Sequence, residues 1–213
     1  YKNFYTEQTM KNFFLAAIVC ALFSGCAYEA QFNQNADVAP FDDTISATNA
    51  MQSALIYIPG ELMGTKSYAA SSKLGRDDEL KIDVGEFVAG EAKRFFGTYL
   101  RRVSVTDDEK ALQGKGLVIA PELSSFGFGF YSSDGIDVSA KPFVRYNLRL
   151  KMFKNGKPIY NQNIAVNERN FGEEEFFGGG QGSYAQIGGI FQKAMANDYA
   201  VHAREILDVI NDN

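Results

Sequence analysis

The fold is decided by residues 144–166, which read VRYNLRLKMFKNGKPIYNQNIAV. Up to Met152, apolar side chains alternate with arginine, asparagine and lysine, a period of two that predicts a half-exposed antiparallel strand. The pair Asn155-Gly156 favours a type I′ turn, because both central residues of that turn need positive φ. Alternation resumes after the turn and continues through Ile164. The sequence therefore predicts a β-hairpin.

Two amphipathic helices are predicted to pack on the sheet that contains this hairpin. Residues 84–101 carry apolar side chains at helical spacing, and Asp83 with Glu86 forms a start that resembles a capping box. The second helix is predicted over residues 183–211, where one stripe collects Ile187, Phe191, Met195, Tyr199, Ile206 and Ile210.

Shorter runs rich in β-formers predict further strands at residues 54–58, 103–106 and 117–121. Residues 126–131, with alternating phenylalanine and glycine, are interpreted either as a strand or as a partner-binding patch. The predicted fold class is α+β: a small, mainly antiparallel sheet with an Asn-Gly hairpin, packed by two helices. We expect one domain over residues 51–213.

The N-terminal segment has the features of an export signal. Met10, which we expect to be the true start, and Lys11 precede an 11-residue apolar run over residues 13–23. A transmembrane helix needs about 20 residues, so this run is too short to span a bilayer. Residues 1–25 are therefore predicted to be a signal peptide.

The apolar run ends in Leu22-Phe23-Ser24-Gly25-Cys26, which resembles the lipobox of bacterial lipoproteins. The resemblance implies that Cys26 carries diacylglycerol and an N-acyl chain such as palmitate, and that the protein is anchored in a membrane. Ala27 after the cysteine implies sorting to the outer membrane of a Gram-negative cell, on the periplasmic face, with exposure at the cell surface as the alternative. The alternative interpretation of this segment is a secretory signal that is cleaved elsewhere, without lipidation.

Residues 26–50 are expected to form a lipidated flexible tether. They are rich in Asn, Gln, Ala and Asp and have no sustained period. A flexible coil of this length would hold the domain on the order of 25 to 30 Å from the lipid.

Composition excludes several classes of partner. The formal net charge of −5 makes nucleic acid an unlikely partner. Both cysteines, Cys20 and Cys26, lie in or beside the apolar run, and His202 is the single histidine. The body therefore has neither thiolates nor clustered histidines for a metal, and no metal or cofactor is expected.

Catalytic patterns are weak. Asp198 precedes His202 by one helical turn, an orienting pair that would still need a nucleophile, and a helix histidine at the margin of the core is the simpler reading. Three consecutive acids, Glu173 to Glu175, lack the interleaved glycines of a calcium loop and favour a solvated acidic loop. The protein is therefore expected not to be an enzyme.

The segment from Phe171 to Gly182 is the candidate contact with a protein partner. Phe176 and Phe177 stand between the three acids and a glycine run, where no period directs both rings inward. Aromatic rings often provide much of the binding energy of a protein interface. Core phenylalanines that flank a loop are the alternative.

The order of elements resembles that of ABC-type transport auxiliary lipoproteins, over roughly residues 53–210, including the helix that runs into Arg101-Arg102-Val103-Ser104-Val105. The resemblance implies an accessory role in the envelope and transfers no site residue. We therefore expect an outer-membrane-anchored periplasmic lipoprotein that acts as a non-enzymatic subunit or adaptor of an envelope assembly. A lipid-handling accessory of a transport system is the alternative, and a hydrolase is a third hypothesis.

Overall fold

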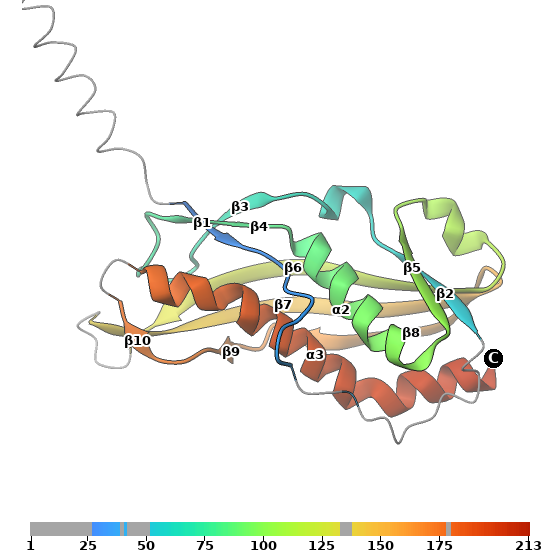
Figure 1. The fold of residues 1–213 in the computed structure, drawn as a ribbon. Helices are drawn as coiled ribbons and strands as arrows, with labels where there is room; N and C mark the ends of the chain where they lie inside the picture. Colours follow the sequence, from blue (N-terminus) through green and yellow to red (C-terminus); the bar gives the residue numbers. More distant parts are fainter. Residues whose placement is uncertain (1–26, 39–40, 42–51, 133–137, 178–179) are drawn as a thin grey trace, which may run out of the picture.

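The predicted Asn-Gly hairpin is present in the computed structural model, which describes residues 27–38, 41, 52–132, 138–177 and 180–213. It joins β7 (Ser139–Lys154) to β8 (Lys157–Val166), as Figure 1 shows. Asn155 has φ 52° and Gly156 has φ 75°, the positive values that a type I′ turn requires. The hairpin prediction is confirmed.

A seven-stranded sheet is built outward from this hairpin. β6 (Leu117–Tyr131) pairs with β7 on one edge, and β8, β9 (Asn170–Phe171) and β10 (Glu175–Phe176) follow one another along the other edge. Beyond β6 lie β2 (Ser53–Tyr57) and β5 (Arg102–Thr106). β2 runs parallel to both of its neighbours, and the pairs made by β7 are antiparallel. The α+β class is confirmed.

β6 joins two segments that the sequence suggested separately. Residues 117–121 and 126–131 belong to one 15-residue strand, with a register shift between Leu123 and Ser125. Pro121 does not end this strand. β2 pairs with β6 only as far as Ile119, so the proline lies where that edge no longer has β2 to bond to.

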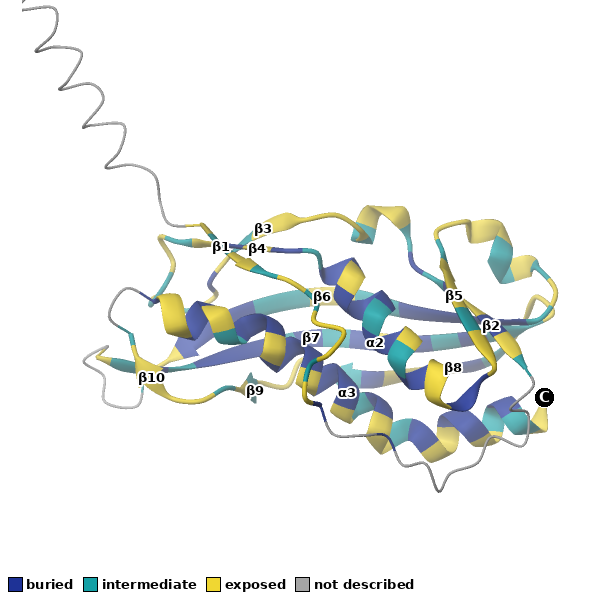
Figure 2. Cartoon of the chain, in the orientation of Figure 1, coloured by how far each residue is buried: buried dark blue, intermediate teal, exposed yellow. Residues whose placement is uncertain are grey.

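Helices α2 (Val84–Tyr99) and α3 (Gln181–Asp212) cover one face of the sheet, and in Figure 2 their buried sides turn toward it. Asp83 caps α2, because its side chain accepts a hydrogen bond of 2.9 Å from the backbone N–H of Glu86. Both helices end within two residues of the predicted bounds. Short 3₁₀ turns occupy Gly60–Leu62 and Glu109–Gln113. Within the described residues, neither helix has the length and apolar character needed to cross a bilayer.

A second, three-stranded sheet contains the start of the described chain. β1 (Ala27–Ala30) pairs in parallel with β4 (Glu79–Ile82), whose other edge carries the antiparallel β3 (Lys66–Ala69). The prediction of a flexible tether is therefore wrong for residues 27–38, and for Phe41, which is only 9% exposed. Residues 26, 39–40 and 42–50 of that prediction lie outside the described residues.

Candidate functional site: a trough along the last helix

The predicted site residues are not brought together. Cys26, like the predicted signal peptide over residues 1–25, lies outside the described residues. Phe176 belongs to β10 and is 74% exposed. Phe177 packs on the core instead, with its ring 4.9 Å from that of Phe130. The prediction that both phenylalanines face outward is wrong for Phe177, because its position after β10 turns its ring toward β6.

Asp198 and His202 do not form the carboxylate–imidazole pair of a catalytic site. His202 Nδ1 lies 2.8 Å from the backbone carbonyl oxygen of Asp198, and the Asp198 carboxylate accepts a hydrogen bond from the Tyr146 hydroxyl. Burial raises the pKa of Asp198 to about 6, although the Tyr146 bond and His202 act to lower it. The carboxylate joins α3 to β7, which is a structural role.

The first described part of the chain, residues 27–38 and Phe41, lies across α2 and α3. The Tyr28 ring stacks on Tyr184 of α3 with centroids 4.0 Å apart. Phe32 packs edge-on against Phe87, directly over Gly90 of α2, where a Cβ atom would overlap its ring. A glycine inside a helix is unfavourable unless something requires the space, and here the crossing chain does.

Glycine allows the same close approach on α3. A Cβ atom at Gly188 would lie 3.3 Å from that of Ala30, so β1 passes directly against the helix backbone. One small position on each helix thus fits the crossing segment, which indicates that residues 27–38 are part of the domain.

A buried ion pair on α2 holds the far end of this segment. Glu91 is fully buried and pairs with Arg94 at 2.7 Å. The Arg94 guanidinium lies over the Phe41 ring, 4.8 Å from its centroid, a cation–π contact. Burial raises the pKa of Glu91, whereas Arg94 and Gln192 act to lower it.

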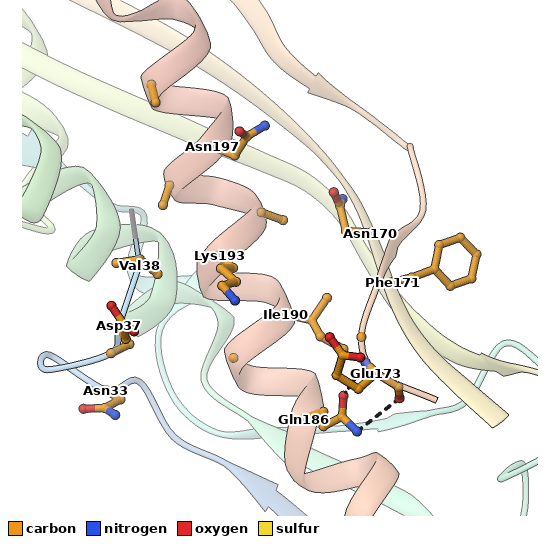
Figure 3. A pocket seen from close by; sticks show the side chains of 16 residues that line it. Asn33, Asp37, Val38, Asn170, Phe171, Glu173, Gln186, Ile190, Lys193 and Asn197 are labelled. Atoms are coloured by element: carbon orange, nitrogen blue, oxygen red, sulfur yellow. Dashed lines mark hydrogen bonds between the residues drawn. The ribbon is translucent and has the colours of Figure 1, made fainter. Parts of the chain in front are cut away.

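Two glutamines of α3 bind backbone on opposite sides of the helix. Gln192 donates to the carbonyl of Asn33 at 2.7 Å and accepts from its N–H at 3.3 Å. Gln186 accepts from the N–H of Glu173 at 2.8 Å and donates to its carbonyl at 3.3 Å, the pair shown in Figure 3. Each amide therefore ties one neighbouring segment to α3 by two bonds.

These segments form the walls of a hollow that we call the α3 trough. Its volume is about 710 Å³, residues 33–38 form one wall, residues 170–173 form the other, and α3 is the floor (Figure 3). Most floor residues are small and one is a cation; the set is Gln186, Gly189, Ile190, Lys193, Ala194, Ala196, Asn197 and Ala200. Asp37 and Glu173 add acids to the two walls.

Comparison with known proteins gives a fold and no family. No protein-family model matches the chain, and no curated protein matches it. A solved structure is similar. Protein XCC0632 from Xanthomonas campestris, assigned to DUF330, aligns with 88% of this chain and 98% of its own, with a TM-score of 0.54 and 8% sequence identity. At this identity the likeness shows the fold alone.

The trough offers groups to which another molecule could bind. Within the described residues no cluster of three or more His, Cys, Asp or Glu side chains is placed to hold a metal ion. The small floor residues allow another chain to approach α3 closely, and the walls, which also contain Val38 and Phe171, offer amide and carboxylate groups for hydrogen bonds. Two mid-helix glycines, Gly90 and Gly188, are the sequence signals for the segment that crosses the helices and continues into one wall of the trough, because they mark places of close approach.

Proposed function

We propose that this protein is a lipoprotein of the outer membrane, anchored through lipid on Cys26 and facing the periplasm, that acts without catalysis as a subunit or adaptor of an envelope assembly. The observation that carries the adaptor role is the α3 trough, whose walls are fixed by the two glutamine pairs. A preformed groove lowers the entropic cost of binding a partner segment.

The beginning of β1 determines how close the proposed anchor would hold the domain to the bilayer. Cys26 is followed directly by Ala27, the first residue of that strand. A lipidated cysteine in this position would join the bilayer and the folded domain with no spacer, which suits a protein that works at the membrane surface. Similarity of fold to the Xanthomonas protein is compatible with this role and adds no function.

The trough favours a protein segment over an acyl chain. Sites for apolar ligands are usually enclosed and lined mostly by apolar side chains. Here the groove is open, and Asp37, Glu173, Lys193 and Asn197 line it beside apolar residues such as Val38 and Ile190. The lipid-handling alternative thus has no specific support from this hollow.

The anchor is tested by replacing the proposed lipid acceptor. Cys26→Ser should abolish palmitate incorporation and leave an unprocessed or soluble protein, because the thiol is the atom to which diacylglycerol attaches. Cys20→Ser is the matched control and should label as the wild type does. Palmitate still incorporated into Cys26→Ser would contradict the proposal.

The adaptor role is tested by filling the trough without disturbing the fold. A Cβ atom at Gly189, in the floor, meets nothing within 4 Å, and the same holds at Gly97 on the exposed side of α2. We expect Gly189→Leu to abolish a specific crosslink formed from a photoreactive residue at Asn197 in intact envelopes. Gly97→Leu should leave the crosslink unchanged. An equal crosslink in both variants would exclude the trough as the docking site.

A further inference from the structure

The described surface gathers its exposed aromatic rings at one end of the molecule. Phe176 is 74% exposed, Tyr131 and Phe171 are each 49% exposed, and Val138 is 46% exposed. The other large hydrophobic side chains that are exposed in the described residues are leucine, methionine or valine. We call Tyr131, Val138, Phe171 and Phe176 the aromatic end.

These four side chains are neighbours through β7. Phe176 pairs with Ser139, Tyr131 with Lys141 and Phe171 with Phe143, so their partners lie within five residues of that strand. The Tyr131 and Phe171 rings are 6.3 Å apart.

The same end holds the point where the chain arrives from Cys26. Tyr28 stacks on Tyr184, the Tyr184 ring lies 4.9 Å from Phe130, and the Phe130 ring lies 4.9 Å from Phe177, which adjoins Phe176. In Figure 1, β1 accordingly starts on the side of the molecule where β10 and the first turn of α3 lie.

The distance from Cys26 to the folded domain is short, because β1 begins at the next residue. Consecutive Cα atoms are about 3.8 Å apart, so acyl chains on Cys26 would leave the domain almost no freedom to stand away from the bilayer. We propose that the aromatic end lies in the membrane interface, with the lipid surface as its occupant. This rests on the proposed lipidation of Cys26.

The chemistry of the aromatic end indicates which lipid contact it makes. Aromatic side chains are favourable at the level of the lipid headgroups. The neighbouring acids Glu173 and Glu175 would repel an anionic surface, and Glu174 is already paired with Lys141 at 3.7 Å. The aromatic end should therefore contact the bilayer through its rings and not through cations. Such binding should need no anionic lipid and should persist at high salt.

The test uses the absence of tryptophan from the chain. Phe176→Trp supplies one fluorophore at the aromatic end, and Val201→Trp supplies one at a residue of α3 that is 70% exposed. Val201 lies 20 residues after Gln181, which is about 30 Å along the helix. The full acylated protein, purified in detergent, is reconstituted into phosphatidylcholine vesicles with and without brominated acyl chains.

Brominated lipid should reduce the emission of Phe176→Trp about twofold or more and leave that of Val201→Trp nearly unchanged, because only the first lies in the interface. Phosphatidylglycerol and high salt should change neither result. Equal emission of Phe176→Trp in both kinds of vesicle would overturn the inference, as would shielding that arises only on addition of envelope proteins. Mass spectrometry of the same samples separates the two proposals: a chain without acyl groups refutes the lipoprotein, whereas an acylated chain without quenching refutes only the aromatic end.

Discussion

Phe41 packs on α2, so its replacement should lower the free energy of unfolding by an amount that can be estimated from its burial. Phe41 is 9% exposed, its ring lies edge-on to Phe95 at 5.0 Å, and Arg94 covers it. Replacing a buried phenylalanine with alanine costs about 3 to 5 kcal/mol, and the residual exposure of this ring places Phe41→Ala near the lower value. A loss of about 3 kcal/mol lowers Tm by roughly 6 to 12 °C in a domain of this size.

Urea unfolding of the chain from residue 27, followed by circular dichroism, measures this effect. Phe176→Ala is the matched control, because the same truncation at a 74% exposed ring should cost within about 0.5 kcal/mol. In a flexible tether, Phe41→Ala would cost as little as the control. Indistinguishable midpoints for the two variants would therefore refute the docking of Phe41 on α2.

Three further predictions concern other parts of the fold. Gly156→Val should cost about 1 to 3 kcal/mol in urea unfolding, because valine strains at φ 75°. Asp198 has its pKa raised to about 6 in the folded state, so its contribution to stability is complete at pH below about 4 and is lost as pH rises through 6. Asp198→Asn should therefore weaken that pH dependence. It should also raise the free energy of unfolding at pH 7 by about 1 kcal/mol, a value reduced to allow for the partial exposure of the carboxyl group. A variant whose stability has the same pH profile as the wild type would contradict this. Phe177→Ala should cost about 1 to 2 kcal/mol and Phe176→Ala nearly nothing; equal costs would show that the two rings share one environment.

The main elements could be predicted because their signals are local. Strict alternation up to Met152 followed by Asn155-Gly156 defines a hairpin with few alternatives, and the Asp83 cap and the apolar stripe of α3 fix the helices. The sequence predicts a strand that ends at Pro121, whereas β6 continues to Tyr131, because β2 leaves β6 after Ile119 and the proline needs no bond on that edge.

The docked N-terminal segment could not be predicted for a different reason. Tyr28, Phe32, Val38 and Phe41 are spaced irregularly, since the chain crosses two helices outside a regular helix or long strand. Its partners lie far along the sequence, as the bond between Asn33 and Gln192 illustrates with a separation of 159 residues. Periodicity detects faces of elements and does not detect such contacts.

The trough and the aromatic end depend on the same long-range packing. The sequence identified Phe176 as exposed for a sound reason, the absence of a period, but gave no means to separate it from Phe177, which packs against Phe130. Which glycine meets a neighbouring chain and which faces open space, as Gly90 and Gly189 do respectively, is likewise visible only in three dimensions.

Hydrogen exchange of residues 27–30 in the membrane-bound protein tests the central claim most directly. In the parallel pair of β1 with β4, Ala27 to Ala30 stand opposite Glu79 to Ile82, and we expect the amides of the two strands to exchange at similarly slow rates. Protection starting one residue after Cys26 would establish that the domain is held at the membrane surface without a spacer. Exchange of residues 27–30 at the rate of an unstructured peptide, with β4 still protected, would show that they are a tether and contradict the account.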